Sequence, residues 1–202
     1  MLPLKSSPGP RYRDSTERLT PGALLVTDGK AVEGILTASR QKKSYNWQAM
    51  VDQATACHTG AAITKTECSQ GVQEAFEKSC QLIGHPPLAP LHDNKSLYDH
   101  KALKIVIEAT TVMIPATPAR PENKAVLEGE FGKFEQTVGA IHLDDSSMET
   151  MRQSAVSEVI RAYTAALNHA GRAEFEGRSR LQVLREACPN PEKDRKFIEQ
   201  LK

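Results

Sequence analysis

The sequence predicts an α+β protein with a mostly helical body, a small antiparallel β element and a long C-terminal helix. Two apolar runs around Asp28-Gly29 predict a β-hairpin over residues 23–36, because Asp-Gly suits a tight type I′ turn. An apolar segment near 134–143 predicts a further strand. Apolar residues at helical intervals over 147–170 predict the long helix, with one face packed against a core.

The chain has 202 residues, close to the upper size of one ordinary domain. Residues 1–20 are rich in Pro, Ser and Arg and hold no continuous apolar run, so we expect a flexible arm followed by one globular domain over 21–202. No apolar stretch reaches the roughly 20 residues of a membrane-spanning helix. These features predict a cytoplasmic protein, and the arm also suits delivery by a specialised secretion system.

Charge gives little support to nucleic-acid binding. The formal net charge is +1, so the protein as a whole has no field that would hold a polyanion, and any such contact needs a local patch. The basic run Arg40, Lys42 and Lys43 is one such patch, and a solvated loop is the simpler interpretation of it. Ser44, which follows, is a candidate cap for a helix carrying Trp47.

Several shorter elements are predicted between these landmarks. Apolar spacing predicts a helix over 69–83 that ends at Gly84, since glycine readily adopts the left-handed conformation after a helix. Prolines predict a loop over 85–96. The β-branched run within 103–113 fits a strand or a helix. Ser146 and Glu149, at capping-box spacing, predict the start of the long helix.

A thiol site is the first catalytic hypothesis. Cys57 could act as a nucleophile, with His142 as its base and Asp144 as the group that orients the imidazole. This set predicts a cysteine-dependent hydrolase or transferase. Equally, Cys57 could be a small buried core residue, since free cysteine is among the most buried residue types.

A metal site is not predicted. The four cysteines form no CxxC pair, and reduced thiols in a cytosol explain them. His85, His92 and His100 follow Cys80, but they offer no closely spaced pair from which a zinc site could be built. We likewise find no dinucleotide or phosphate-binding motif and predict no cofactor.

One region resembles a known family. The order of its segments is Cys80-Gln81-Leu82-Ile83-Gly84, then Leu88 with Pro90, then Leu97-Tyr98-Asp99-His100-Lys101-Ala102-Leu103, then Pro115-Ala116-Thr117. This order resembles that of U-box ubiquitin-ligase modules, including those of secreted bacterial effectors. The resemblance implies a metal-free scaffold that binds an E2 ubiquitin-conjugating enzyme. It also implies that Ile83, Tyr98, Leu103 and Pro115 are partner-binding residues, with Ile83 and Pro115 on the two loops and Tyr98 and Leu103 in the helix between them.

Three functional hypotheses follow from the sequence. The leading one is a protein-binding protein that acts through contacts with another protein, and a delivered effector is one form that this hypothesis takes. The alternatives are a U-box-like E3 ligase and the cysteine-dependent enzyme. The oligomeric state stays open.

Overall fold

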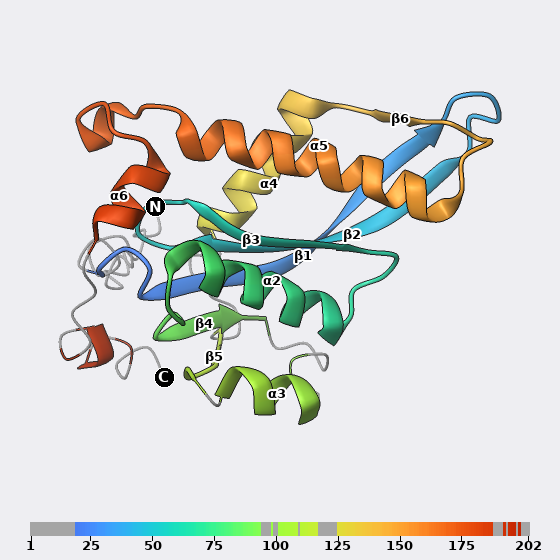
Figure 1. Ribbon diagram of the computed structural model, residues 1–202. Coiled ribbons are helices and arrows are strands. Elements are labelled where there is room, and N and C mark those ends of the chain that lie inside the picture. The colour runs from blue at the N-terminus through green and yellow to red at the C-terminus, as the bar shows by residue number, and fades with distance from the viewer. Residues whose placement is uncertain are drawn as a thin grey trace, which may run out of the picture.

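A mixed six-stranded sheet lies at the centre of the computed structural model, with helices against both of its faces (Figure 1). The structure describes residues 19–93, 98, 101–108, 110–116, 125–187, 192, 194–196 and 198. Its strands are β1 (Leu24–Leu36), β2 (Lys42–Asp52), β3 (His58–Thr64), β4 (Ala89–His92), β5 (Ile114–Pro115) and β6 (Ile141–Leu143). Its helices are α2 (Ser69–Ile83), α3 (Lys101–Glu108), α4 (Ala125–Val138), α5 (Glu149–His169) and α6 (Arg180–Glu186), with a short 3-10 helix, η3 (Ala173–Phe175).

The strand order is β3-β2-β1-β4-β5, and β6 pairs separately with β1. β1, β2 and β3 are antiparallel, whereas β4 and β6 run parallel to β1. Parallel pairs require crossover connections, here provided by helices. The prediction of a mostly helical body with a small antiparallel hairpin was therefore wrong, because the sheet is the centre of the fold and has both strand directions.

The predicted hairpin at Asp28-Gly29 is one continuous strand. β1 runs through both residues, and β2 pairs with it from Leu25 to Ile35 without interruption. The chain turns only after Leu36, where Arg40 has a positive φ of 59°. An Asp-Gly signal describes local preference, and eleven paired positions on the neighbouring strand outweigh it.

The predicted helix after Ser44 is strand β2. Tyr45 and Trp47 lie on one face of the sheet, and Gln48 and Met50 lie on the other. Both faces are covered by helices, so nearly every residue of β2 from Tyr45 onward is buried. A strand buried on both faces loses the alternation of polar and apolar residues that would identify it in a sequence.

The helix predicted over 69–83 is confirmed as α2, and Gly84 ends it with a φ of 88°. The segment 85–96 was predicted as a loop but contains β4. The segment 103–113, which fitted either state, begins within α3. The strand predicted near 134–143 is mostly the end of α4, and only β6 within it is extended.

The predicted long helix is confirmed as α5, but its start and its buried face differ from expectation. The capping box does not form, because the Ser146 hydroxyl donates to Asp144 instead, at 2.7 Å. Val156, Ile160 and Tyr163 face the core. Met148 and Met151, which the apolar stripe included, are 66% and 56% exposed.

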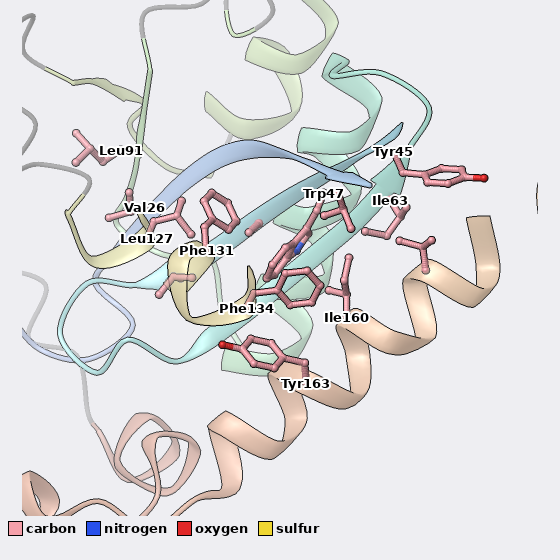
Figure 2. Packing of buried hydrophobic residues seen from close by; sticks show 14 of the residues in the cluster. Val26, Tyr45, Trp47, Ile63, Leu91, Leu127, Phe131, Phe134, Ile160 and Tyr163 are labelled. Carbon is pink, nitrogen blue, oxygen red and sulfur yellow. The ribbon is translucent and has the colours of Figure 1, made fainter. Parts of the chain in front are cut away.

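The two faces of the sheet bury different cores. The first, under α4 and α5, centres on Trp47, whose ring lies 5.1 Å from those of both Phe131 and Phe134 (Figure 2). The second, under α2 and α3, is mainly aliphatic, with Phe76 and Tyr98 as its aromatic members. None of the helices that the structure describes is long and apolar enough to cross a membrane.

Candidate functional site

The residues of the predicted thiol site do not come together. Cys57 is fully buried and its backbone carbonyl accepts from Asp52, which pairs with Leu25 near the start of β1. His142 of β6 pairs with Ile35, near the end of β1. Ten residues of strand separate these positions, about 33 Å at the usual rise. Asp144 follows β6 and accepts from Ser146 and Ser147.

The environment of Cys57 also disfavours a thiolate. Burial, with the nearby charge of Asp52, raises the pKa of the Cys57 thiol to about 12. A nucleophilic cysteine needs the opposite shift, from a cation or a helix N-terminus. The structure places Cys57 as a core residue at the end of the sheet.

The residues named by the U-box resemblance are divided between core and surface. Tyr98 and Leu103 are buried in the second core, and the Tyr98 hydroxyl accepts from Gln48 at 3.1 Å. Ile83 packs partly buried at the end of α2, so the Cys80–Gly84 segment is helical rather than a loop. Pro115 is exposed in β5. Binding of an E2 enzyme remains a prediction.

A different group of residues, all acidic, gathers around the middle of β1. One edge of β1 pairs with β4 at Leu24–Val26 and with β6 at Gly34–Leu36. Between them, residues 27–33 pair with β2 alone among the described strands. Asp28 lies at the start of this open edge, half-buried, and its carboxylate accepts from the Gly29 amide at 2.9 Å.

Asp93 directly follows the neighbouring strand, β4, and stands level with Asp28 of β1. Val26 pairs with Leu91 in the parallel β1–β4 ladder, so two residues further along each strand lead to Asp28 and Asp93. Leu91 belongs to the first core, whereas His92 stacks on Tyr98 of the second core at 4.5 Å. Alternation along the strand therefore carries Asp93 to the first face. Asp28 follows Val26 to that face in the same way.

Glu128 approaches the same region from α4. The preceding residue, Leu127, is fully buried in the cluster that contains Val26 and Leu91 (Figure 2). Two helical turns further on, Glu135 pairs with Lys30 of β1 at 2.6 Å. Residues seven apart share one face of a helix, so Glu128 lies on the side of α4 that meets β1. Glu128 itself is exposed.

The donor chemistry of these three carboxylates suits Mg²⁺, a hard cation that takes oxygen ligands and is held by few carboxylates. The two aspartates fit such an ion by position, since their strands are adjacent and their side chains share a face. Within the described part of the chain, no three His, Cys, Asp or Glu side chains lie close enough to hold a metal in this conformation. A third ligand would require a change in the Glu128 side chain, which exposure permits.

A second glutamate of α4 is held in a very different environment. Glu130 is buried, and Arg180 of α6 binds its carboxylate with two parallel contacts of 2.9 Å from Nη1 and Nη2. His58 Nε2 lies 3.2 Å from Oε2, and Lys133 Nζ lies 2.7 Å from Oε1. Burial would raise the pKa of Glu130, but the hydrogen bonds from these partners outweigh it and hold that pKa well below its usual range. Glu130 is therefore a structural anion.

His58 completes this cluster as a neutral donor. Burial lowers the pKa of His58, against the opposing pull of the Glu130 carboxylate. Its Nδ1 has no hydrogen-bond partner among the described residues, so Nε2 carries the proton that faces Glu130. The His58 backbone is fixed by Asn168 of α5, which bonds both its amide and its carbonyl at 2.9 and 2.7 Å.

Asp28, Asp93 and Glu128 were not among the functional residues predicted from the sequence. A signal was present: each aspartate comes one residue after a short apolar run, with Thr27 or His92 between, and Glu128 comes 35 residues after Asp93 in a segment that forms a helix. The signal was missed because Asp28 had been assigned to a turn and Asp93 to a proline loop. Acidic residues that are far apart in the sequence gain meaning as a site only once their strands are known to be adjacent.

Comparisons with known proteins support this fold through structure alone. No described protein family matches the sequence, and no curated protein matches it. Among solved structures, the chain is similar to the HTLV-2 integrase catalytic core domain in complex with magnesium in its dimeric form, with a TM-score of 0.58 and 16% identity, covering 82% of this chain and 98% of that one. The trimeric form of the same domain gives a TM-score of 0.57 and 16% identity, and the match covers 82% of this chain and 97% of that one.

A larger assembly shows the same likeness. One chain of the cryo-EM structure of the simian T-cell lymphotropic virus intasome in complex with PP2A regulatory subunit B56 gamma is similar to this chain, with a TM-score of 0.59 and 15% identity. The match covers 82% of this chain but 55% of that one, so this chain spans about half the length of the intasome chain. At these identities, the likeness establishes a shared fold.

Proposed function

We propose that this chain is a magnesium-dependent catalytic core that cleaves or joins nucleic-acid strands by phosphoryl transfer. The observation that carries the proposal is the placement of Asp28 on β1 level with Asp93, which directly follows the adjacent parallel strand β4. Glu128 lies on α4, which is tied to β1 through the pair of Glu135 and Lys30. The fold shared with the HTLV-2 integrase catalytic core domain, which is in complex with magnesium in both its dimeric and its trimeric form, supports the proposal.

Asp28, Asp93 and Glu128 would hold the metal through carboxylate oxygens. A bound Mg²⁺ would neutralise charge on a phosphodiester and activate the attacking water or hydroxyl. Asp28 and Asp93 are fixed by the sheet, so they would orient the substrate relative to the protein. Glu128 is exposed on α4 and would complete the ligand set when the metal enters.

Nucleic-acid binding was not expected from the composition of the chain. The net charge of +1 provides no general attraction, so binding must depend on local contacts near the site and should weaken with added salt. Lys30 lies two residues from Asp28 on the same strand, where it pairs with Glu135. It is the nearest cation along β1.

The test is cleavage or joining of a labelled DNA duplex with Mg²⁺ or Mn²⁺ by the full chain. Asp28→Asn, Asp93→Asn and Glu128→Gln should each lower the rate by about a hundredfold or more, because the metal supplies several kcal/mol of transition-state stabilisation. Glu158→Gln on α5, whose glutamate is exposed and paired with Arg161, is the matched control and should keep full activity. If each of the three variants kept the activity of the wild type, the proposal would be ruled out.

Contact with another protein, the leading expectation from sequence, is a second candidate. The exposed pair Met148 and Met151 at the start of α5 supports it, because flexible thioether side chains adapt well to partner surfaces. A core that cuts or joins nucleic acid can bind proteins as well, so the two candidates are compatible.

A further inference from the structure

Two glutamates of α4 stand two residues apart in opposite environments. Glu128 is exposed on the side of the helix that meets β1, whereas Glu130 is 1% exposed. Two residues turn the helix by about 200°, so the two side chains leave it on opposite sides. Because less than one helical turn separates them, fixing the position of Glu130 also limits the positions that Glu128 can take.

The carboxylate of Glu130 is fully occupied by protein groups. Both of its oxygens accept from Arg180, and each also faces a second donor, His58 or Lys133. Arg180 Nη1 also donates to the Ala56 carbonyl at 2.9 Å, which ties α6 to the turn before β3. A planar, two-point contact of this kind fixes orientation as well as distance.

The helix at this point has little rigidity of its own. Gly129 and Gly132 flank Glu130, and a Cβ added at either position would meet no atom within 4 Å. Packing therefore does not require glycine there, and glycine inside a helix weakens it. The geometry of this turn must be set by its contacts with the rest of the protein, which are the packing of Leu127 and Phe131 and the ion pair of Glu130.

A buried ion pair is a poor device for stability alone. The cost of removing both charges from water often equals or exceeds their attraction, and apolar pairs of similar volume frequently serve as well. An apolar pair, however, does not fix the orientation of one side chain relative to the other, as a two-point ion pair does. Two glycines weaken α4 beside Glu128, and a metal ligand must be held in a fixed orientation. A metal site would therefore need an ion pair that fixes the orientation of this part of the helix.

We propose that Glu130, held by Arg180 and His58, is an anchor that fixes the first turns of α4 and thereby positions Glu128 for metal binding. The inference rests on the proposed function and extends it to the C-terminal part of the chain. Glu130, Arg180 and His58 are positioning residues, since none of them would touch the metal or the substrate. Helix α6 is then a required part of the active core.

The test replaces the ion pair with an apolar pair in the full chain. Glu130→Leu combined with Arg180→Met leaves no unpaired buried charge, so the variant should unfold cooperatively near the wild-type midpoint. Its affinity for Mn²⁺, measured by calorimetric titration, should fall by about tenfold or more, as is typical when groups that orient a metal ligand are lost. The matched control removes the exposed pair of α5, Glu158→Gln with Arg161→Gln, and should keep wild-type affinity.

A second variant decides the matter if the double variant does not fold. Arg180→Lys keeps a cation beside Glu130 but loses the two-point contact, so a severalfold weaker Mn²⁺ affinity in a folded protein supports the anchor. Wild-type affinity in either folded variant overturns the inference and leaves the proposed function intact. Failure of the wild-type chain to bind Mn²⁺ overturns the proposed function and the inference together.

Discussion

The two faces of the sheet differ in where they hold charge. The face under α4 and α5 carries Asp28, Asp93 and the buried pair of Glu130 with Arg180, around an aromatic core. The face under α2 and α3 buries a neutral network instead, in which Gln48 donates to both Thr27 and Tyr98, at 2.8 and 3.1 Å. Ionised groups are costly to bury, so a fully buried ion pair on the face that also carries Asp28 and Asp93 points to a function there.

The largest effect on stability should come from the charged face. Arg180→Ala leaves the Glu130 carboxylate buried without its main partner, which should lower the free energy of unfolding by about 3–5 kcal/mol. Urea denaturation at pH 7 measures it. The control, Arg161→Ala, breaks an exposed pair and should cost less than about 1 kcal/mol. Equal losses in both variants would remove the distinction between the buried and exposed pairs.

The same comparison has a pH dependence of known sign. The pKa of Glu130 is held below its unfolded value in the folded protein, so its ion pair stabilises the fold above about pH 4.3 and this stabilisation is lost as the pH falls towards the folded pKa. The difference in free energy of unfolding between wild type and Arg180→Ala should therefore shrink as the pH falls from about 5 to about 3, a range of roughly one unit on either side of the unfolded pKa of a glutamate. A difference that grows on acidification would contradict the assignment of Glu130 as an anion.

The smallest effect should come from the neutral face. Tyr98→Phe removes one hydrogen bond with Gln48 and should lower the free energy of unfolding by about 1 kcal/mol. Metal affinity and strand cleavage should change far less than in the variants of the charged face, because the Tyr98 ring is buried in the second core and its hydroxyl, although close enough to feel the charge of Asp28, holds no metal ligand in place. Loss of activity in this variant, with the fold intact, would mean that the two faces are not functionally separate.

Helices were more predictable from this sequence than strands. α2 and α5 each contain at least 15 residues with a helical apolar repeat, and α2 ends at a glycine that adopts the left-handed conformation. β2 was mistaken for a helix because burial on both faces removes alternation. β1 was split at Asp28-Gly29 because a turn preference is local, whereas the pairing that overrides it comes from a strand elsewhere in the chain.

The candidate site was hidden by the same errors. Asp28 and Asp93 are 65 residues apart in sequence and become neighbours only through the parallel pairing of β1 with β4. Cys57, His142 and Asp144 were chosen by residue type and order, and the sheet places the first two at opposite ends of β1. The anchor was equally invisible, since it joins His58, Glu130 and Arg180 from three separate elements.

Direct titration with a divalent metal tests the central claim. Calorimetric titration of the full chain with Mn²⁺ should show saturable binding, which Asp28→Asn should weaken by about tenfold or more because it removes a charged oxygen ligand fixed by the sheet. Glu158→Gln should bind as the wild type does. Binding that is absent from the wild-type chain, or equal in the wild type and Asp28→Asn, would contradict a metal site at the open edge of β1.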